Sequence, residues 1–294
     1  MSDSALSPQL IRPLAMPTGV KVSLRQGVGQ AFVIAYREST HRLEAQLAQQ
    51  GLTYQVLRQF DVPELEGAAA IYRCMVNHSQ AWKQAAIAPT PSLIMEADFV
   101  PVVDMANLPI PFDVRQANVG LGWLYTCAPQ IYSVSPHGFA EGFSTSLVAY
   151  VITPQGAAHL CSLVDWVTAQ YGKGYSTFDS TIDRFLRDRG LQNYVAFRNY
   201  GEHGGIPNPE HRRHGFSGIH RADVLYGPLT FCPTYAGTGI WAPWRYGLAR
   251  LHAKAKGLGR LVCGRFVRPH VLQTTRHPWL MIQFAIARQF TLRL

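Results

Sequence analysis

The sequence predicts an α/β fold built around a mainly parallel central sheet. Three observations support this prediction: short apolar runs alternate with amphipathic segments, the first such segments read strand, helix, strand, and acidic residues directly follow a buried apolar run. Strand-helix-strand units imply parallel strands joined by a right-handed crossover. With 294 residues, 47% of them apolar, the chain has enough material for a large core, which excludes disorder as its dominant state.

The first unit occupies residues 31–58. Residues 31–36 (AFVIAY) form a continuous apolar run with Val and Ile, which is typical of a buried strand. Residues 41–50 place Leu43 and Leu47 four positions apart, between a Ser-Thr pair that can cap a helix and a glycine that can end it. Residues 53–58 (TYQVLR) then alternate as a second strand.

Acidic residues close the next strand. A helix is expected over residues 69–88, where a proline ends it, and residues 92–95 (SLIM) have the composition of a buried strand. Glu96 and Asp98 follow at once. Open parallel sheets bind ligands in the crevice outside the carboxyl ends of their strands, so these two acids are expected at a ligand site.

The rest of the chain continues the alternation. Two further strands and two further helices are expected, over residues 121–126, 146–152, 154–170 and 178–189. A proline at position 154 suits the first turn of a helix. Residues 200–220 crowd Gly, Pro and His together and are expected to form a loop.

Positive charge is concentrated towards the C-terminus. The chain has 27 Lys and Arg against 18 Asp and Glu, a net charge of +9, yet residues 1–240 hold 17 basic and 18 acidic groups, about −1. Residues 242–294 hold ten Lys or Arg and no acid. Because the basicity belongs to one segment, it argues against nucleic acid as the partner of the whole protein.

Cysteine usage and hydropathy indicate a cytoplasmic protein. The five cysteines are scattered, without the close spacing of a zinc or redox motif. The N-terminal residues are polar and interrupted by proline, unlike a secretory signal. Apolar runs fall short of the roughly 20 residues that span a bilayer, so no transmembrane helix is expected.

Glu96 and Asp98 are the strongest candidates for chemistry. Being two positions apart on an extended chain, they lie on the same side and offer hard oxygen ligands for Mn²⁺ or Mg²⁺. Such an ion neutralises a diphosphate leaving group. Acids after a strand also serve as helix caps or loop residues, and that alternative is open at this point.

Four segments carry a resemblance to a known family. They are AFVIAYRESTHRLEAQLAQQGL (31–52), CMVNHSQAWK (74–83), LIMEADFVPV (93–102) and FSTSLVAYVITPQGAAHL (143–160). In this order they resemble the opening strand and helix, the Cys-x-x-Ser-His helix, the Leu-Glu-Asp-Asp strand end and the Thr-x-x-Tyr-x-Ile segment of glycosyltransferase family 25, the lipopolysaccharide and collagen-type galactosyltransferases. The chain departs from that pattern at Arg73, Asn77 and Ala97, where the family has Gly, Ser and Asp.

The resemblance implies a GT-A-like nucleotide-sugar-binding sandwich. It implies transfer of a hexose, galactose favoured, from a UDP-sugar to a lipopolysaccharide or other glycan acceptor, with inversion at the anomeric carbon. Asp98, with Glu96 directly or through water, would hold the divalent cation (Mn²⁺ or Mg²⁺) on the donor diphosphate.

Four residues are expected at the donor. Arg37 and Arg42 lie beside the first strand and would add cationic contacts, although Arg42 equally suits an exposed helix face. Asn77 and His78 match the family's Ser-His pair. A helical histidine near a tryptophan is also a common buried structural residue, so both roles are open for His78.

Acceptor activation needs a general base near the attacking hydroxyl. Asp179 matches the family's Asp at this place, and Asp183 lies one helical turn on; helix capping is the alternative for Asp179. In the glycine-rich loop, Glu202 and His203 are expected as polar contacts to donor or acceptor. The spacing of the loop histidines fits no zinc pattern: His203, His211, His214 and His220.

The segment 241–294 is expected to be a basic amphipathic extension. Its apolar and aromatic residues alternate with ten cations, a composition that suits the headgroup region of an anionic membrane. A solvated helix face and an RNA-binding arm are the alternatives.

These predictions combine into one hypothesis. A polar N-terminal extension (1–27) precedes a glycosyltransferase domain (28–240) and the basic extension (241–294), in a cytoplasmic protein peripheral to the inner face of a membrane. The acceptor would be a glycan or lipid-linked oligosaccharide. The alternative from another class is a catalytically silent relative that binds glycans or membranes as a scaffold.

Overall fold

The computed structural model describes residues 21–205, 213–214 and 220–290. Its centre is an eight-stranded sheet in the order β2-β1-β3-β8-β5-β9-β7-β6. Six strands point the same way, while β8 and β7 run opposite to their neighbours. This confirms the expected α/β fold with a mainly parallel sheet. The strands are β1 (Gln30–Ala35), β2 (Tyr54–Arg58), β3 (Ser92–Glu96), β5 (Val119–Trp123), β6 (Gln130–Val134), β7 (Ala140–Phe143), β8 (Ala149–Ile152) and β9 (Gln192–Val195).

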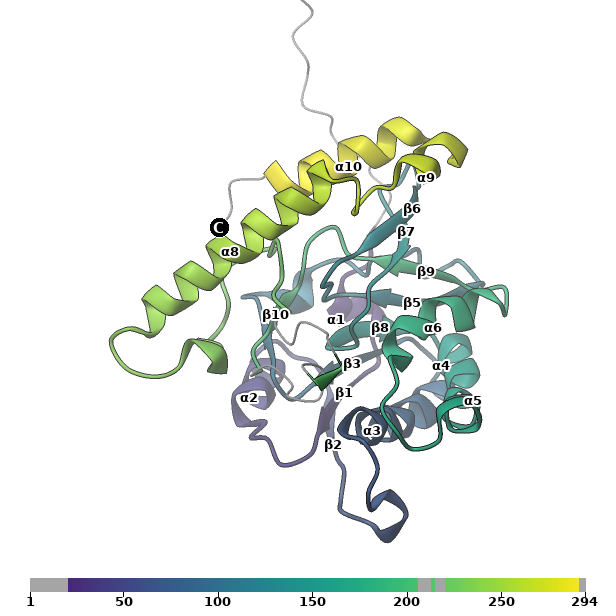
Figure 1. Ribbon diagram of the computed structural model, residues 1–294, viewed down its shortest axis with the longest axis vertical. Helices are drawn as coiled ribbons and strands as arrows, with labels where there is room; N and C mark the ends of the chain where they lie inside the picture. The colour runs from purple at the N-terminus through teal and green to yellow at the C-terminus, as the bar shows by residue number, and fades with distance from the viewer. Residues whose placement is uncertain (1–20, 206–212, 215–219, 291–294) are drawn as a thin grey trace, which may run out of the picture.

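A two-stranded sheet and the helices complete the described fold (Figure 1). The small sheet pairs β4 (Phe99–Pro101) with β10 (Gly201–His203). The α-helices are α1 (Leu24–Gly27), α2 (His41–Gln49), α3 (Ala70–Ala86), α4 (Pro154–Leu160), α5 (Leu163–Tyr171), α6 (Phe178–Arg187), α8 (Ala242–Val262), α9 (Pro269–Thr274) and α10 (Pro278–Phe290). The 3-10 turns are η1 (Pro63–Leu65), η2 (Met105–Asn107) and η3 (Thr234–Ala236).

Alternation along the strands creates two cores. In β1, Phe32 and Ile34 join the core formed with α3, α4, α5 and α6, whereas Ala31 and Val33 join the core formed with α1 and α2. Successive side chains of a strand point to opposite faces, so a continuous apolar run is what a sheet covered on both faces requires.

The order of the first strands creates a crevice. The chain leaves β1, passes through α2 on one face to β2, and returns through α3 on the other face to β3, so β1 lies between its two parallel partners. Crossovers that leave a strand on opposite faces make a topological switch point, where doubly wound sheets bind ligands. The carboxyl ends of β1 and β3 border this crevice.

Some elements differ from those expected. The helix expected over 154–170 is divided into α4 and α5, with Cys161 and Ser162 between them. The short strands β6, β7 and β9 were not expected, because each has only four or five residues and mixes polar with apolar residues instead of forming an apolar run. Gly142 in β7 has a steric reason: a Cβ there would lie 2.2 Å from the carbonyl oxygen of Gln130.

The glycine-rich loop is partly a strand, since β10 falls inside the segment expected to be a loop. His203, His214 and His220 lie within the described residues, whereas His211 and residues 1–20, 206–212, 215–219 and 291–294 lie outside them.

The basic C-terminal segment packs on the sheet domain. Met281 and Phe284 of α10 are buried in the core shared with α3 and α6. α8 runs unbroken through Gly257, where a Cβ would lie 2.7 Å from the Cβ of Asp223, so glycine permits this close approach. Figure 1 shows α8 and α10 lying side by side across one end of the sheet. In the described part of the chain, no helix has both the length and the apolar character to cross a membrane.

Two buried ion pairs attach this segment. The Arg288 guanidinium is fully buried and lies 2.6 Å from Oδ1 of Asp223. Arg250 of α8 lies 2.8 Å from Oε2 of Glu202, whose side chain is also fully buried. Breaking a buried pair leaves an uncompensated charge, so each pair ties a C-terminal helix firmly to the domain.

Candidate functional site

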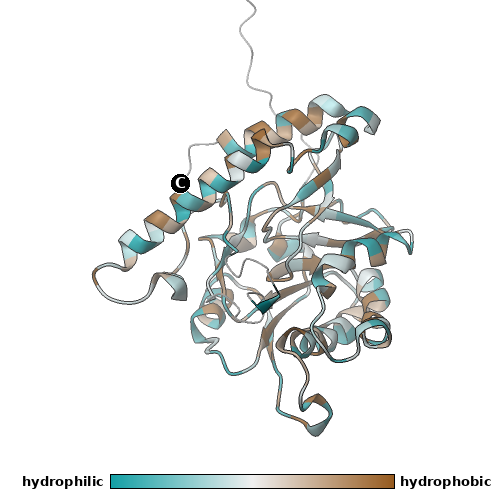
Figure 2. Ribbon diagram, in the orientation of Figure 1, coloured by the Kyte–Doolittle hydropathy of each residue, from teal (hydrophilic) through white to brown (hydrophobic). Residues whose placement is uncertain are grey.

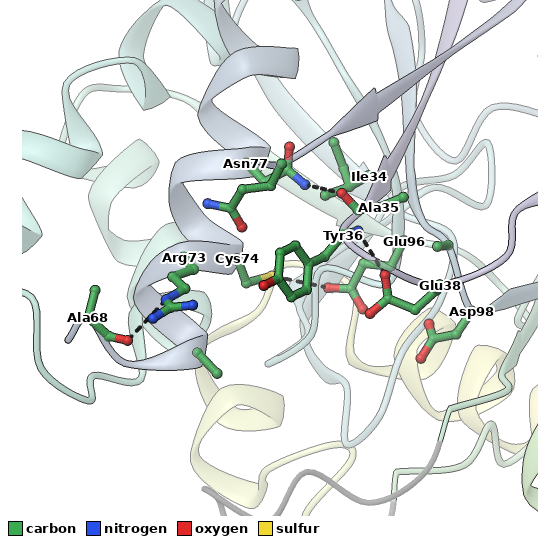
Figure 3. Close-up of a pocket in the computed structure, with 13 residues that line it drawn as sticks. Ile34, Ala35, Tyr36, Glu38, Ala68, Arg73, Cys74, Asn77, Glu96 and Asp98 are labelled. Carbon is green, nitrogen blue, oxygen red and sulfur yellow. Dashed lines mark hydrogen bonds between the residues drawn. The ribbon is translucent and has the colours of Figure 1, made fainter. Parts of the chain in front are cut away.

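A cavity of about 480 Å³ opens at the carboxyl ends of β1 and β3 (Figure 3). We name it the β1 cavity. Tyr36 borders it from the end of β1, Cys74 and Asn77 from α3, and Glu96 and Asp98 from the end of β3. It therefore occupies the switch point of the sheet, and its volume is in the range of small-ligand sites.

Asp98 is paired with His203 from a distant part of the chain. β10 pairs antiparallel with β4 and places His203 opposite Phe99, so Nε2 of His203 lies 2.9 Å from Oδ2 of Asp98. Burial alone would lower the pKa of His203, but the Asp98 carboxylate raises it to about 9. Burial alone would likewise raise the pKa of Asp98, which the imidazolium instead holds below its ordinary value.

Two glycines allow this contact. A Cβ on Gly205 would lie 2.1 Å from Oδ2 of Asp98, and a Cβ on Gly204 would lie 2.7 Å from the Asp98 carbonyl oxygen. Real Cβ atoms do not approach other atoms so closely. The Gly-Gly pair that the sequence shows after His203 therefore lets the backbone pass directly beside the carboxylate.

Glu96 is held by a buried chain of polar groups. Nε1 of Trp82 donates to the hydroxyl of Tyr150 at 2.8 Å, and Nδ1 of His78 lies 3.0 Å from the same hydroxyl. Nε2 of His78 lies 3.4 Å from Oε1 of Glu96. His78, which is fully buried, thus orients a candidate ligand instead of facing the cavity.

Asn77 and Cys74 complete this wall. Nδ2 of Asn77 donates to the carbonyl oxygen of Ala35 at 2.8 Å, which fixes the end of β1 against α3. The Cys74 thiol points to Glu96, with 3.9 Å between Sγ and Oε1. Burial, together with the Glu96 charge, raises the pKa of Cys74, so the thiol is neutral at pH 7.

The residues present fit a divalent cation. One oxygen each of Glu96 and Asp98 and one nitrogen of His203 lie within 4.8 Å of one another. Oδ1 of Asp98 is buried and has no hydrogen-bond partner among the described residues, so the pocket holds an unused oxygen ligand. Two carboxylates and an imidazole suit Mn²⁺ in particular. A second group, Cys74, His78 and Glu96, also meets this distance, but its thiol is neutral and so is not a metal ligand.

A second cavity, of about 320 Å³, contains Asp179. We name it the Asp179 cavity. It shares Glu96 and Asp98 with the β1 cavity and is also lined by His203 and His220. Burial, with a smaller effect from the Glu96 charge, raises the pKa of Asp179 to about 7. A carboxylate that titrates near neutral pH is suited to exchange a proton with a bound group.

Three residues that the sequence suggested lie away from these cavities. Asp183 is buried and accepts hydrogen bonds from Tyr132 and Asn193, so it supports α6 from inside. Glu202 is paired with Arg250 and accepts from the Ala222 amide. The Arg42 guanidinium lies over the ring of Phe231.

Arg37 lies at the edge of the site. It binds Asp61 at 2.8 Å and lines a neighbouring cavity that shares Tyr36 and Arg73 with the β1 cavity. The structure therefore brings together Glu96, Asp98, Asn77, His78, His203 and Asp179, with Arg37 beside them.

Sequence reasoning did not single out Arg73 and Tyr125 as site residues. Arg73 lines the β1 cavity and is its cationic residue from α3; its position next to Cys74, where the resembled family has Gly, was the available sign. Tyr125 is buried, its ring lies 6.2 Å from that of His203 between centroids, and its hydroxyl has no hydrogen-bond partner within the described chain. Nothing in the sequence around Tyr125 distinguishes it from a core tyrosine.

Comparison with known proteins yields several partial structural likenesses. No protein-family model matches the chain, and no curated protein matches it. A glycosyltransferase involved in glycosylation of the major capsid of PBCV-1 aligns with 57% of this chain and 81% of its own, at 11% identity and a TM-score of 0.38. A mutant of Drosophila β-1,4-galactosyltransferase 7, in complex with manganese, UDP-Gal and xylobiose, aligns with 63% and 74%, at 15% identity and a TM-score of 0.36. At these values the likenesses do not define a family.

Proposed function

We propose that the protein is a glycosyltransferase that moves a hexose from a nucleotide diphosphate sugar to a glycan acceptor. One observation carries this proposal: Glu96, Asp98 and His203 meet at the switch point of the sheet, between two adjoining cavities. A transferase with two substrates needs two binding spaces that meet at the reacting centre. The shared carboxylates are at that meeting point.

The β1 cavity is the proposed donor space. Asp98 and Glu96, with His203, would hold Mn²⁺ or Mg²⁺, and the ion would supply positive charge for the diphosphate leaving group. Arg73 from α3 adds a cation on the same wall, and Arg37 adds one at the rim. Asn77 contributes by fixing the end of β1 through Ala35.

The Asp179 cavity is the proposed acceptor space. With its pKa near 7, Asp179 takes the proton from the attacking hydroxyl and returns it to solvent as the product leaves. One base on the face opposite the leaving group corresponds to displacement with inversion. Asp183 is not available for this role while Tyr132 and Asn193 bind it.

Turnover tests this proposal. UDP release from UDP-galactose and other UDP-sugars is measured with Mn²⁺ and a glycan acceptor, for the native chain, Asp98→Asn and Asp179→Asn. Asp188→Asn is the matched control, since Asp188 is an exposed carboxylate just after α6 that pairs with Arg184. We expect both site variants to lose about 100-fold or more in rate and the control to stay native. Donor binding without turnover in any variant would instead establish the catalytically silent scaffold.

We propose family 25 as the relationship, with galactose as the favoured sugar and a lipopolysaccharide or lipid-linked oligosaccharide as acceptor. This proposal is supported by the position of two of the segments that resemble the family. Cys74 and Asn77 from one segment line the β1 cavity together with Glu96 and Asp98 from the other. A donor screen that shows preference for a different nucleotide would contradict this assignment.

We propose further that α8 lies on the anionic surface of a membrane, with the protein on its cytoplasmic side. Trp241, Trp244, Leu248 and Leu251 recur at three- and four-residue intervals and form one exposed stripe; the two tryptophans are 64% and 65% exposed. Figure 2 shows hydrophobic residues interspersed with hydrophilic ones along this helix. Exposed aromatic residues among cations suit an anionic headgroup layer.

Vesicle binding tests this location. The native chain is expected to co-sediment with vesicles containing phosphatidylglycerol and not with pure phosphatidylcholine, and Trp244→Ser with Leu248→Ser is expected to abolish the difference. Trp166→Ser, at an exposed tryptophan of α5, is the control. Self-association through the stripe, measured by ultracentrifugation without vesicles, would contradict the membrane proposal.

A further inference from the structure

A row of basic residues leads away from the Asp179 cavity along α8. His252, Lys256 and Arg260 recur every four residues and so share one face of the helix. They line a cavity of about 160 Å³ together with His220 and Arg221. Because His220 also lines the Asp179 cavity, the two cavities adjoin at this residue.

A third cavity continues the row. It has a volume of about 360 Å³ and lies beyond Arg260, which lines both cavities. Arg265 and Arg268 line it as well, beside Gln130, and no Asp or Glu is among its lining residues. We call Lys256, Arg260, Arg265 and Arg268 the cationic row.

The fold itself does not use these charges. In the described residues, Arg260, Arg265 and Arg268 make no ion pair, whereas Arg250 and Arg288 each have a buried carboxylate. Like charges four residues apart on a helix repel each other, as do guanidinium groups around one cavity. An anion is therefore the group that would relieve this repulsion, and arginine forks match the oxygens of phosphate or carboxylate.

We propose that the cationic row binds an anionic group, a phosphate or carboxylate, carried by the acceptor. This inference rests on the proposed glycosyltransferase function, because it assigns the Asp179 cavity to the acceptor. The row adjoins that cavity, while the donor diphosphate is assigned to the β1 cavity, which shares no lining residue with the cavity of His252, Lys256 and Arg260. An acceptor with its hydroxyl at Asp179 would extend its charged end past His220 to Arg260.

The volumes of the two cavities along the row, about 160 and 360 Å³, favour a small anion over a macromolecule. The residues of the row line these cavities, which suit single phosphate or carboxylate groups. The apolar stripe proposed for the membrane lies towards the other end of α8, at Trp241 and Trp244. Bilayer and RNA binding are outcomes that the test separates.

Calorimetry with small charged sugars tests the proposal. Glucose 6-phosphate, glucuronate and neutral glucose are titrated into the full native chain, into Arg260→Gln with Arg268→Gln, and into Arg245→Gln with Arg276→Gln. The last pair removes the same charge from exposed C-terminal positions outside these cavities. Binding of glucose 6-phosphate would identify the anionic group as a phosphate, and binding of glucuronate would identify it as a carboxylate. Either result supports the proposed anion site. Neutral glucose is expected not to bind.

The two pairs of substitutions give the decisive comparison. We expect Arg260→Gln with Arg268→Gln to weaken binding about tenfold or more, since charge-assisted contacts are lost, and the control pair to stay within about twofold. Equal losses in both pairs, or no binding of either charged sugar to the native chain, would overturn the proposal. Binding confined to a single-stranded RNA or to anionic vesicles would overturn it too.

The same samples separate this inference from the proposed function. UDP binding with Mn²⁺ is measured in parallel, and we expect Arg260→Gln with Arg268→Gln to keep native UDP affinity. If the native chain binds charged sugar but not UDP, the proposed function fails while the anion site stands. If it binds UDP but neither charged sugar, the proposed function stands and the anion site fails.

Discussion

Nε2 of His203 and Oδ2 of Asp98 lie 2.9 Å apart, which links the loop after β10 to the carboxyl end of β3. The contact brings an imidazole to two carboxylates that the sequence places together by themselves. It also leaves Oδ1 of Asp98 buried and unpaired within the described structure, on a residue that lines both cavities. The proposed chemistry depends on this arrangement.

Gly205→Ala is expected to weaken Mn²⁺ binding. The new Cβ would lie 2.1 Å from Oδ2 of Asp98 and would push the loop, with His203, away from the carboxylate. Displacement of a ligand by such a clash is expected to cost about tenfold or more in ion affinity, measured by Mn²⁺ paramagnetic relaxation. Gly227→Ala is the control, since a Cβ there meets no atom within 4 Å. Native affinity in Gly205→Ala would show that the close approach of the loop has no role.

The rate of transfer is expected to rise with pH through about 7 and then level off, because Asp179 acts only when ionised and its pKa is about 7. Asp179→Asn should give a low rate without this rise. A native profile that is flat between pH 5 and 8, or a rise that persists in Asp179→Asn, would exclude Asp179 as the base.

Asp179 also affects stability in a definite direction. Its folded pKa lies above its unfolded value near 4, so its contribution to stability is full below pH 4 and is lost as the pH rises through about 7. Asp179→Asn should therefore unfold at higher urea than the native chain at pH 8, by on the order of 2 kcal/mol, and the difference should shrink towards pH 4. The opposite pH trend would contradict the raised pKa.

Tyr150→Phe is expected to destabilise the protein and to weaken ion binding. The substitution removes the partner of both Trp82 Nε1 and His78 Nδ1 and leaves buried polar atoms unpaired, at a cost of about 1–3 kcal/mol in urea unfolding. Because His78 then orients Glu96 less firmly, Mn²⁺ affinity should fall about tenfold. Tyr171→Phe, at an exposed tyrosine, should change neither quantity. Lost stability with unchanged ion affinity would restrict this chain of groups to packing.

Arg250→Met is expected to loosen α8 from the domain. It leaves the fully buried Glu202 carboxylate without its ion pair, which costs about 3–5 kcal/mol in the free energy of unfolding. Burial already raises the pKa of Glu202, and loss of the guanidinium should raise it further. Arg245→Met, at an exposed position on the same helix, is the control. A cost below about 1 kcal/mol would mean that the pair does not hold the helix.

Local patterns predicted the first half of the fold well. β1 and the strand that ends at Glu96 are short continuous apolar runs, and α2 has the amphipathic pattern of a helix. Each of these patterns is complete within a short stretch of sequence, so the local sequence predicts the element. The strands β7 and β9 pair with each other, and β9 also pairs with β5, across long stretches of sequence that a local window does not contain. α8 remains a helix through Gly257 because Asp223 packs there, and this too is a tertiary effect.

The same division holds for the candidate site. Glu96 and Asp98 were predictable because a strand end is a local feature. The pairing of His203 with Asp98 arises from the β4–β10 register, and the internal role of Glu202 arises from Arg250 on a helix far along the chain. A polar residue in a glycine-rich loop can face a cavity or the core, and only the fold separates His203 from its neighbour Glu202.

The most direct measurement is calorimetric binding of UDP, with and without Mn²⁺, to the native chain and to Asp98→Asn, with Asp188→Asn as the control. The account predicts that the native chain and the control bind UDP only when Mn²⁺ is present, and that Asp98→Asn does not bind it in either condition. Binding of UDP by the native chain that is unaffected by chelation of the ion, or that persists unchanged in Asp98→Asn, would contradict the central claim that Asp98 holds a cation on the donor diphosphate.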